Sequence, residues 1–395
     1  IESMYKVLTL NNIAVAGLRH LPRERYEVAS EIAHPDAIIL RSYNMHDMEI
    51  PETVAAIGRA GAGTNNIPVE AMAARGVPVF NAPGANANAV KELAIAGLLM
   101  AARNLCDARE YVKNLDETGD ALNKAVEAGK KQFVGFELPG KTLGVIGLGA
   151  IGVEVANAAL ELGMKVVGFD PAITVRRAWQ LSSGVDHAET LDQLFQHADA
   201  VSVHVPLIDA TRNLVNRDRI ALMNKGGTII NFARNGIVDN EATLAALDSG
   251  HLHAYVSDFP TAGLIAHPKV IALPHLGAST SEAEENCAIM VAENLKDYLE
   301  NGNIRFSVNF PECRLPRMDA YRITIANANV PNMVGQISTC LGDAGLNIED
   351  LLNKSIGGLA YTIVDVNEPV TDEIEAKLRS IDGVLTLRNL GKPVT

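Results

Sequence analysis

A glycine-rich turn in the middle of the chain constrains its fold more than any other feature. Leu143–Ile146 is expected to be a buried strand, Gly147-Leu-Gly-Ala-Ile-Gly152 follows it, and Ala150–Leu162 has a helical pattern. A second expected strand, Lys165–Phe169, ends at an acid, Asp170. Glycines at these spacings allow a tight turn and the close approach of a pyrophosphate to a helix N-terminus. The sequence therefore predicts a dinucleotide-binding unit, and another domain is expected before it.

Short apolar runs alternate with helical patterns through most of the first 300 residues. Helical patterns such as Leu191–Gln196 and Asn240–Ser249 separate the runs. This alternation is typical of doubly wound parallel sheets. The runs expected to form buried strands, besides the two named above, are Ala37–Leu40, Val77–Phe80, Ala200–Val205, Thr228–Phe232, Ala254–Val256 and Val270–Leu273.

Two long helical stretches, Asn88–Asn104 and Ser281–Glu300, mark where the chain is expected to cross between domains. Each crossover would join a first domain to the dinucleotide unit. We therefore expect a first, substrate-binding domain made of residues 1–87 and 280–305. The nucleotide-binding domain, residues 88–279, would be inserted between its two parts.

The last part of the chain has a different pattern. Residues 306–319 include Pro311 and Pro316 and mixed charges, which is typical of a linker. Residues 320–395 are expected to form strands and helices in the order β-α-β-β-α-β, the order of a small ferredoxin-like domain. The sequence thus predicts an α/β protein with two doubly wound parallel-sheet domains and a third, ferredoxin-like domain.

Composition and charge argue against several classes of protein. The formal net charge is −13 at pH 7, whereas nucleic-acid binders need basic surfaces. The cysteines form no C-x-x-C pair and no cluster with histidines, so neither a metal site nor a disulfide framework is expected. The N-terminus has no secretion-signal pattern, and apolar stretches such as Leu93–Ala102 are too short to cross a membrane. We therefore expect a cytoplasmic protein.

Asp170 bears on which dinucleotide is bound. An acid at the end of the second strand can accept hydrogen bonds from the adenosine ribose hydroxyls, and it repels a 2′-phosphate. Arg176 and Arg177 follow a few residues later and could in principle receive that phosphate. We expect NAD rather than NADP.

Two residues that suit the chemistry of a 2-hydroxy acid lie just past expected strands. Arg234 follows Thr228–Ala233, and His275 follows Val270–Pro274. Open α/β sheets bind ligands at this carboxyl edge. Histidine titrates near neutrality and can accept the proton of a hydroxyl group, whereas the arginine fork can hold a carboxylate. Taken singly, a capping histidine and a surface arginine are the simpler interpretations.

Several motifs together resemble one enzyme family. The fingerprint from Gly147, His204-Val-Pro206, Asn231-Phe-Ala-Arg234-Asn-Gly-Ile-Val-Asp239 and Pro274-His275-Leu-Gly-Ala-Ser-Thr280 occur in this order in D-isomer-specific 2-hydroxyacid dehydrogenases. Further matches are Arg41-Ser42, Gly61-Ala-Gly63-Thr-Asn and Asn81-Ala-Pro83. The resemblance covers essentially the whole chain, including a third domain similar to ACT domains.

The resemblance implies a role for each of these residues. Arg234 would hold the substrate carboxylate, and His275 would be the acid/base. Candidate cofactor contacts are Gly147, Gly149, Ala150, Ile151, Gly152, Asp170, His204, Pro206, Phe232, Ala233, Arg234, Asp258, His275, Gly277 and Ala278. Candidate substrate contacts are Arg41, Ser42, Ala62 and Gly63, with Lys130 and Lys131 as candidates for a phosphate or, equally, a solvated charge pair.

The chain departs from the family pattern at two points. The family usually has Asp-Val-Phe after the sixth strand of the nucleotide domain, where this chain has Ser257-Asp258-Phe259. Asp258 is either the same carboxamide-binding acid shifted by one residue or a different feature. The family also pairs the histidine with a glutamate, but residues 259–268 contain no acid, with Ala262 and Gly263 where one is expected. His275 is therefore expected to lack its partner unless Asp258 replaces it.

The third domain is expected either to bind an amino-acid effector such as serine or to serve assembly alone. ACT-like domains commonly bind amino acids at a dimer interface, in the loop after the first strand. Here that loop contains Asn327 and Asn329, and Asn347 lies further on. Their amides could bind the carboxylate or the amine of an amino acid.

The ACT-like domain favours 3-phosphoglycerate as the substrate, because it suggests control of amino-acid synthesis. The expected reaction is NAD-dependent oxidation to 3-phosphohydroxypyruvate, the first step of serine synthesis, by a homo-oligomer (dimer or tetramer). The alternatives are glycerate/hydroxypyruvate or D-lactate as substrates. From a different class, a dinucleotide-sensing binding protein without catalysis is supported only by the missing glutamate.

Overall fold

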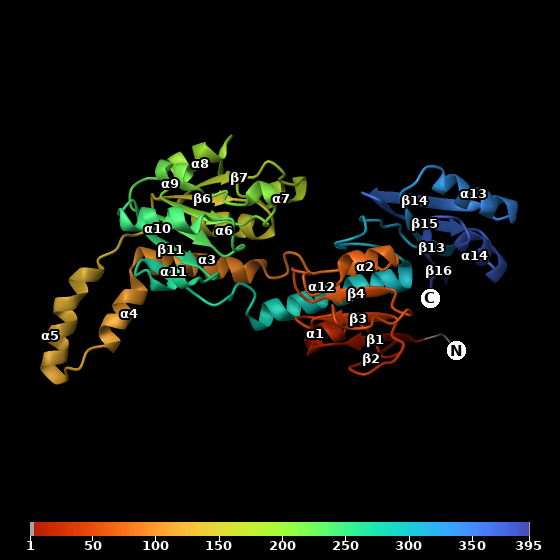
Figure 1. The fold of residues 1–395 in the computed structure, drawn as a ribbon, viewed down its shortest axis with the longest axis horizontal. Coiled ribbons are helices and arrows are strands. Elements are labelled where there is room, and N and C mark those ends of the chain that lie inside the picture. Colours follow the sequence, from red (N-terminus) through yellow and green to blue (C-terminus); the bar gives the residue numbers. More distant parts are fainter. Residues whose placement is uncertain (1–3, 395) are drawn as a thin grey trace. The chain divides into compact units, whose positions relative to one another are not determined.

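The computed structural model describes residues 4–394, which form two compact units (Figure 1). Unit 1 contains the chain up to Ala85 and from Glu284 onward, and unit 2 is Asn86–Ala283. Residues 1–3 and 395, the ends of the first and third expected domains, lie outside the described residues. No helix in the described part of the chain is long and apolar enough to cross a bilayer.

Unit 2 is built on a seven-stranded parallel sheet in the order β12-β11-β10-β9-β6-β7-β8. The order reverses between β6 and β9, which creates the switch point where such sheets bind ligands. The strands are β6 Thr142–Ile146, β7 Lys165–Phe169, β8 Asp186–His187, β9 Ala200–Val203, β10 Gly227–Asn231, β11 Leu252–Ser257 and β12 Val270–Ala272.

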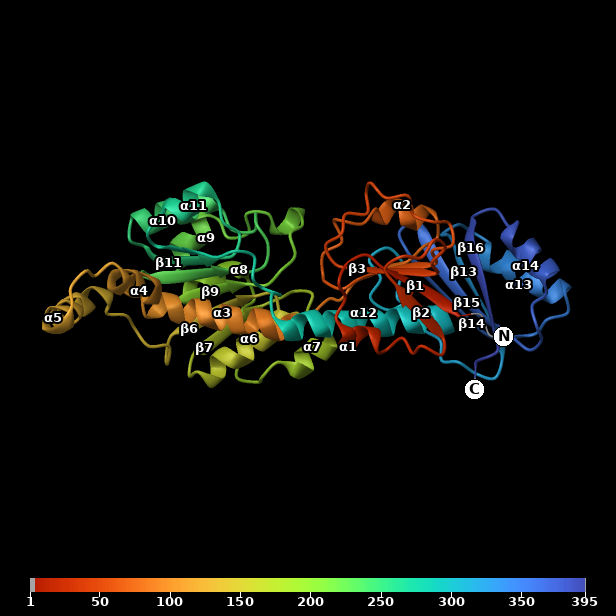
Figure 2. The same cartoon turned by 90° about the horizontal axis from the view of Figure 1, so that it is seen from below.

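Helices cover both faces of this sheet, so its strands are apolar on both sides. Val145 of β6 packs with α3 and α6, whereas the next residue, Ile146, packs with α8 to α10 on the other face. Figure 2 shows helices on both sides of this sheet. The helical segments of unit 2 are α3 Ala87–Ala102, α4 Leu105–Lys113, α5 Gly119–Gly129, η1 Lys130–Phe133, α6 Ala150–Glu161, α7 Val175–Gln180, α8 Leu191–His197, η2 Asp209–Thr211, α9 Arg217–Leu222, α10 Asn240–Asp248 and α11 Ala262–Ala266.

The helices α4 and α5 form an arm that projects from the body of unit 2 (Figure 1). The α4 helix buries no residue, and α5 buries only Gly129. Tyr111 holds the arm together, because its hydroxyl donates to the Ala125 carbonyl at 2.8 Å and its ring contacts Phe133. Leu105 and Val112 are about half exposed, at 48% and 51%.

Unit 1 begins with a five-stranded parallel sheet in the order β2-β1-β3-β4-β5. Its core is completed by α12, Ser281–Asn301, which presents apolar residues from Cys287 to Leu299 at helical spacing. Thr280 caps this helix by accepting the Ala283 N–H. The other elements are β1 Tyr5–Thr9, α1 Val15–Leu18, β2 Tyr26–Ala29, β3 Ala37–Leu40, β4 Ala56–Arg59, α2 Val69–Ala74 and β5 Val79–Phe80.

The last part of unit 1 is a four-stranded antiparallel sheet in the order β14-β15-β13-β16, with two helices on one face. In chain order the elements are β13 Tyr321–Ala328, α13 Met333–Asp343, β14 Ile348–Ile356, β15 Leu359–Val366, α14 Asp372–Arg379 and β16 Val384–Gly391. This β-α-β-β-α-β order is ferredoxin-like. The predicted fold class, two parallel-sheet domains and a ferredoxin-like domain, is therefore confirmed.

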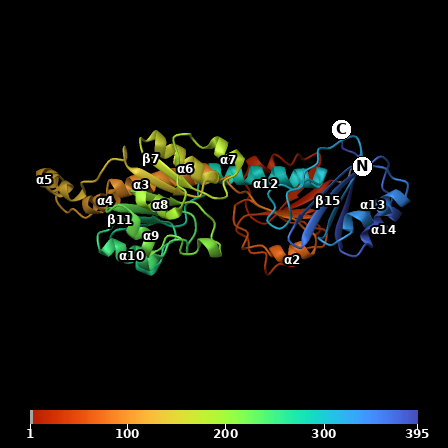
Figure 3. The same ribbon diagram turned by 90° about the horizontal axis from the view of Figure 1, so that it is seen from above.

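The other face of the antiparallel sheet packs on the end of α12 (Figure 3). Arg388 donates to the carbonyls of Tyr298 and Leu299 near the C-terminus of α12, in addition to the bonds that these carbonyls accept from the Gly302 N–H and the Tyr5 hydroxyl. Arg322, fully buried, forms two 2.7 Å bonds with Asp365 and also donates to the Asn301 carbonyl. The two sheets of unit 1 therefore share one core.

Candidate active site

The glycine turn lies between β6 and α6 at the switch point. Gly147 has a φ of +88°, and a Cβ there would meet the His204 carbonyl oxygen at 2.3 Å. A Cβ on Gly152 would lie 1.8 Å from the Gly147 oxygen. By contrast, a Cβ on Gly149 would meet nothing within 4 Å, because it would point into open space at the N-terminus of α6. This open cradle fits a pyrophosphate.

Asp170 closes one side of the turn. Its Oδ2 accepts the Leu148 N–H at 2.8 Å, and its Oδ1 accepts the Ala172 N–H at 2.9 Å. A carboxylate held by two backbone groups is fixed in place and keeps lone pairs for further donors. The residue therefore fits the expected contact with ribose hydroxyls. Arg176 and Arg177 lie on the following helix, α7.

His204 and Pro206 lie beside the turn after β9. The His204 N–H donates to the Ile146 carbonyl at 2.7 Å, and its Nε2 is 2.7 Å from the Ser202 hydroxyl. Burial lowers the pKa of His204 to about 4. The ring is therefore neutral near pH 7, and it forms part of the wall of the turn.

Arg234 follows β10 in a loop that Asn231 organises. The buried Asn231 amide accepts the Ala233 N–H at 3.1 Å and donates to the Arg234 carbonyl at 3.0 Å. The exposed guanidinium of Arg234 donates to the Ala233 carbonyl at 2.7 Å. Within residues 4–394 no carboxylate pairs with it, so it keeps donors for an anion. Phe232 is buried at the base of this loop.

Asp258 and His275 follow the next two strands, β11 and β12. The Asp258 side chain is fully buried, and its Oδ2 accepts the N–H groups of Leu276 and Gly277 at 3.2 and 3.3 Å. Its Oδ1 is buried without a partner among the described residues. Burial raises the pKa of the Asp258 carboxyl, and the charge of His275 opposes this shift.

The exposed His275 ring contacts Phe259, with the ring centroids 5.0 Å apart. In the part of the chain that the structure describes, the imidazole forms no hydrogen bond. The segment where an acid was expected folds as α11 instead, and Thr261 caps this helix. The carboxyl edge of the unit 2 sheet thus carries three predicted residues, Arg234, Asp258 and His275, which follow the consecutive strands β10, β11 and β12. Gly277 and Ala278 lie directly after His275.

The sequence-predicted residues of unit 1 lie together past β3 and β4. The Arg41 N–H donates to Asn11, and its guanidinium pairs with Glu284 at 2.8 Å. Ser42 is exposed beside it. Asn81 donates to the Ala62 carbonyl, and Arg59 donates to the carbonyls of Arg41 and Gly63.

Lys130 and Lys131 do not lie near Arg234 and His275 within unit 2. Near the start of α3, Val90 packs beside Gly277, and near its end the Ala101 carbonyl lies 2.9 Å from His253 Nε2 at the start of β11. These two ends are about 16 Å apart along the helix axis. The lysines are on η1, beyond the far end, and Lys130 pairs with Glu127. The expected phosphate contact is therefore not formed with the Arg234 loop of the same unit.

The three asparagines of the third domain are not brought together either. Asn327 is buried, accepts a bond from Thr362, and lines a cavity of about 150 Å³ with Asn329. Asn347 precedes β14, whose first residue, Ile348, pairs opposite Val366, as Tyr321 does at the start of β13. Asn347 is therefore at the opposite end of the sheet from Asn327.

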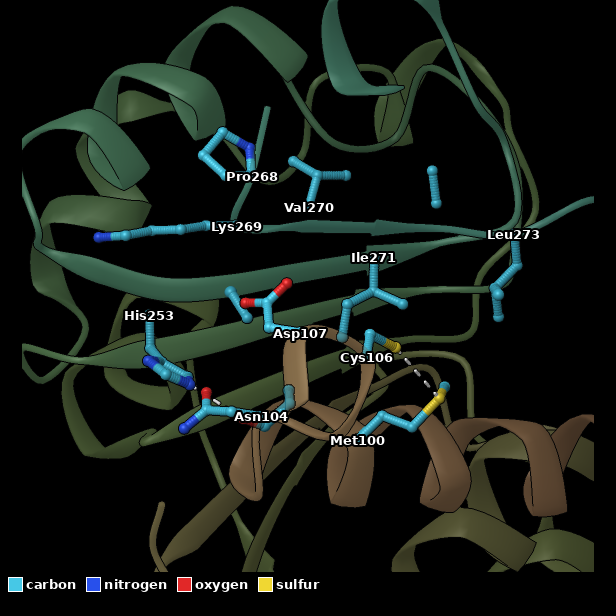
Figure 4. Close-up of a pocket in the computed structure, with 13 residues that line it drawn as sticks. Met100, Asn104, Cys106, Asp107, His253, Pro268, Lys269, Val270, Ile271 and Leu273 are labelled. Atoms are coloured by element: carbon cyan, nitrogen blue, oxygen red, sulfur yellow. Dashed lines mark hydrogen bonds between the residues drawn. The ribbon is translucent and has the colours of Figure 1, made fainter. Parts of the chain in front are cut away.

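A larger cavity, of about 350 Å³, lies at the free edge of β12 in unit 2 (Figure 4). It contains none of the predicted site residues. Polar groups of Asn104, α4 and β11 face it together with apolar groups of α3 and β12. The residues that line it include Met100, Asn104, Cys106, Asp107, His253, Lys269, Ile271 and Leu273. Among the described residues, no cluster of His, Cys, Asp or Glu could hold a metal ion.

The comparisons with known proteins agree with this architecture. Residues 95–277 match the family model "D-isomer specific 2-hydroxyacid dehydrogenase, NAD binding domain". A D-3-phosphoglycerate dehydrogenase from Methanocaldococcus jannaschii is 35% identical over 338 residues, which are 82% of this chain and 61% of that protein. The chain thus spans less than two thirds of that relative. A protein of the same name from Haemophilus influenzae is 33% identical over 87% of this chain and 83% of its own length.

A solved structure gives the same picture. NAD⁺-bound 3-phosphoglycerate dehydrogenase from Entamoeba histolytica superposes with a TM-score of 0.60 at 26% identity, over 78% of this chain and 99% of that one. The glycine turn and its acid therefore lie in an NAD-binding domain. The chain belongs to the D-isomer-specific 2-hydroxyacid dehydrogenase family.

Proposed function

We propose that this protein oxidises D-3-phosphoglycerate to 3-phosphohydroxypyruvate with NAD, the first step of serine synthesis. One observation carries the proposal: Arg234 and His275 follow β10 and β12, the two strands that flank β11, at the sheet edge that also holds the glycine turn. A cation for a carboxylate and a base for a hydroxyl proton thus lie beside a dinucleotide site. The names of the relatives from M. jannaschii and H. influenzae support this substrate.

The residues at the glycine turn suit the pyrophosphate and the adenosine ribose of NAD. The cradle at Gly149, with Ala150 and Ile151, would hold the pyrophosphate. Asp170 would accept from the ribose hydroxyls, and its charge would exclude a 2′-phosphate. Further wall residues would be Gly147, Gly152, His204, Pro206, Phe232, Ala233, Gly277 and Ala278.

Asp258 would contact the carboxamide end of the same site. Its Oδ1 is a buried acceptor without a donor among the described residues, and such an atom is costly unless a ligand satisfies it. When bound, NAD supplies the hydride acceptor. This unsatisfied oxygen supports the interpretation of Asp258 as the shifted family acid.

We assign the role of general acid/base to His275. Its neutral imidazole would accept the hydroxyl proton during oxidation, and the imidazolium would return it in the reverse direction. Arg234 would hold the carboxylate through its unpaired donors. In unit 1, Arg41, Ser42, Ala62 and Gly63 are proposed contacts for substrate oxygens. Lys130 and Lys131 are assigned no contact with the substrate of their own unit 2 site.

We also propose the domain division expected from the sequence: residues 1–87 with 280–305, 88–279, the link 306–319, and 320–395. The Asn327 and Asn329 cavity supports an amino-acid effector such as serine, with Asn347 supplied by a second copy. The uncovered arm and the open cavity at the edge of β12 support a homo-oligomer. The unbonded cysteines are in keeping with a cytoplasmic location.

The test is a spectrophotometric assay of NADH formation with 3-phosphoglycerate, and in parallel with D-glycerate and D-lactate. The expected result is the highest kcat/KM with 3-phosphoglycerate and a loss of roughly 10²- to 10⁴-fold in His275→Ala. A higher kcat/KM with glycerate would show that glycerate, and not 3-phosphoglycerate, is the substrate. Binding of NAD without turnover of any hydroxy acid would favour a dinucleotide sensor.

A further inference from the structure

Asp258 is bound to the turn that carries His275. Its Oδ2 accepts the N–H groups of Leu276 and Gly277, the two residues that directly follow the histidine. Asp258 is fully buried, and Gly277 is buried beneath the turn. The backbone of this turn therefore cannot shift without breaking two hydrogen bonds to a buried carboxylate.

Few other contacts constrain the His275 side chain. Its ring contacts Phe259, but this contact fixes neither ring nitrogen. Residues 260–268 contain no acid, and they form α11 and its cap, Thr261. The orientation that a direct carboxylate partner would provide must come from another group.

The Asp258 charge also acts on the imidazole. Burial raises the pKa of Asp258, and His275 acts in the opposite direction, so the two groups interact through space. Tyr255 of β11 is a further titratable group beside Asp258, and burial raises its pKa. From α3 the neighbour of the turn is an apolar residue, Val90.

We infer that Asp258 is a positioning residue for the acid/base step: Oδ2 fixes the His275 turn, and the carboxylate charge acts on the imidazole without a direct hydrogen bond. The inference rests on the proposed function, in which His275 moves the proton. It differs from the carboxamide contact proposed above, because that contact uses the other oxygen, Oδ1.

Two variants separate the two effects. Asp258→Asn keeps an oxygen that can accept the two N–H groups but removes the charge, whereas Asp258→Ala removes both. Asp248→Asn is the matched control, because Asp248 pairs with a different histidine, His267, at 2.8 Å in the same unit. Folding is checked by thermal unfolding of each variant.

The first measurements use cofactor-free protein and are independent of turnover. Amide hydrogen exchange of Leu276 and Gly277 is expected to rise by at least about tenfold in Asp258→Ala and to change little in Asp258→Asn. The NMR titration curve of the His275 ring is expected to differ between Asp258→Asn and wild type, because the variant removes the neighbouring negative charge. Asp248→Asn should change neither.

The kinetic measurement then compares kcat and KM. Asp258→Ala is expected to lower kcat by about 10²-fold with a smaller change in KM for the hydroxy acid, because a misplaced base slows the reaction more than binding. Asp258→Asn should move the acid limb of the oxidation profile to lower pH and retain more of kcat.

Unchanged amide exchange in Asp258→Ala would overturn the role of Oδ2, and an equal His275 titration in Asp258→Asn and wild type would overturn the role of the charge. Both results are read without substrate. Failure of the wild type to oxidise any hydroxy acid would instead overturn the proposed function, so the two failures are distinguishable.

Discussion

Replacing Gly149 with alanine is expected to weaken dinucleotide binding and leave the fold intact. The backbone at Gly149 has φ −79° and ψ −157°, which alanine adopts without strain. Its added methyl would meet no atom of the protein within 4 Å. The loss of a helix N-cap, about 1 kcal/mol, is offset in part by the smaller entropy of the unfolded chain, so the free energy of unfolding should change by less than about 1 kcal/mol.

The same methyl occupies the space in which a pyrophosphate approaches the backbone. We expect at least about a tenfold loss of NAD affinity, or about 1.4 kcal/mol. Gly152→Ala is the contrasting variant, because its Cβ would lie 1.8 Å from the Gly147 oxygen and must force the turn apart. Overpacking of this kind costs about 1–3 kcal/mol, so this variant should lose stability as well as binding.

The assay uses the chain's single tryptophan. Trp179 is 86% exposed on α7, the helix that follows Asp170, so its fluorescence should report NAD binding directly. Each variant is titrated with NAD, and its unfolding is followed by circular dichroism. Wild-type affinity in Gly149→Ala would refute the assignment of the cradle. A drop in stability equal to that of Gly152→Ala would show that the space at position 149 is not open.

Three further results are expected. Asp170→Ala should weaken NAD binding and narrow the difference between NAD and NADP, measured as the ratio of kcat/KM for the two; equal use of both by the wild type would contradict the reasoning. Because burial on folding lowers the pKa of His204 from its ordinary value of 6.5 to about 4, the unfolded chain takes up the proton first as the pH falls, and stability is lost between pH 6.5 and 4. The loss is up to about 3 kcal/mol, and His204→Gln should reduce it in urea unfolding at pH 7 and pH 5; equal pH dependence in both proteins would exclude this contribution. Asp365→Asn should destabilise unit 1 by about 3–5 kcal/mol, because Arg322 would be left buried without its counter-charge, and an unchanged melting temperature would contradict this.

The parallel sheets can be predicted because most of their strands are continuous apolar runs. The predicted strand Ala37–Leu40 has the same bounds as β3 in the structure. The strands β1, β2 and β4 are not predicted, because a lysine, a glutamate and a glycine interrupt their apolar patterns. The arm of α4 and α5 is not predicted either: both helices are amphipathic, but their apolar residues are few, are interspersed with charged residues and bury almost nothing within unit 2.

The site is predictable where a motif is local and less so where distant segments meet. Arg234 and His275 stand out because each follows a strand directly. Glu284 does not, although it pairs with Arg41, because 243 residues separate the two in the sequence. Arg59 is missed for a related reason: its bonds to the Arg41 and Gly63 carbonyls reach loops after different strands. Sequence shows that an acid is missing near His275, but only the fold shows what Asp258 binds.

The shared core of unit 1 has a consequence for synthesis of the chain on the ribosome. Val7, Ile39 and Phe80 are made first, yet the α12 residues that cover them follow about 200 residues later. At about 5–20 residues per second, the first sheet waits roughly 10–40 s for that helix, and longer for the antiparallel sheet. Residues 86–283 can fold as a unit during this interval. The nascent first sheet therefore carries an incomplete apolar core until α12 and the antiparallel sheet have been synthesised.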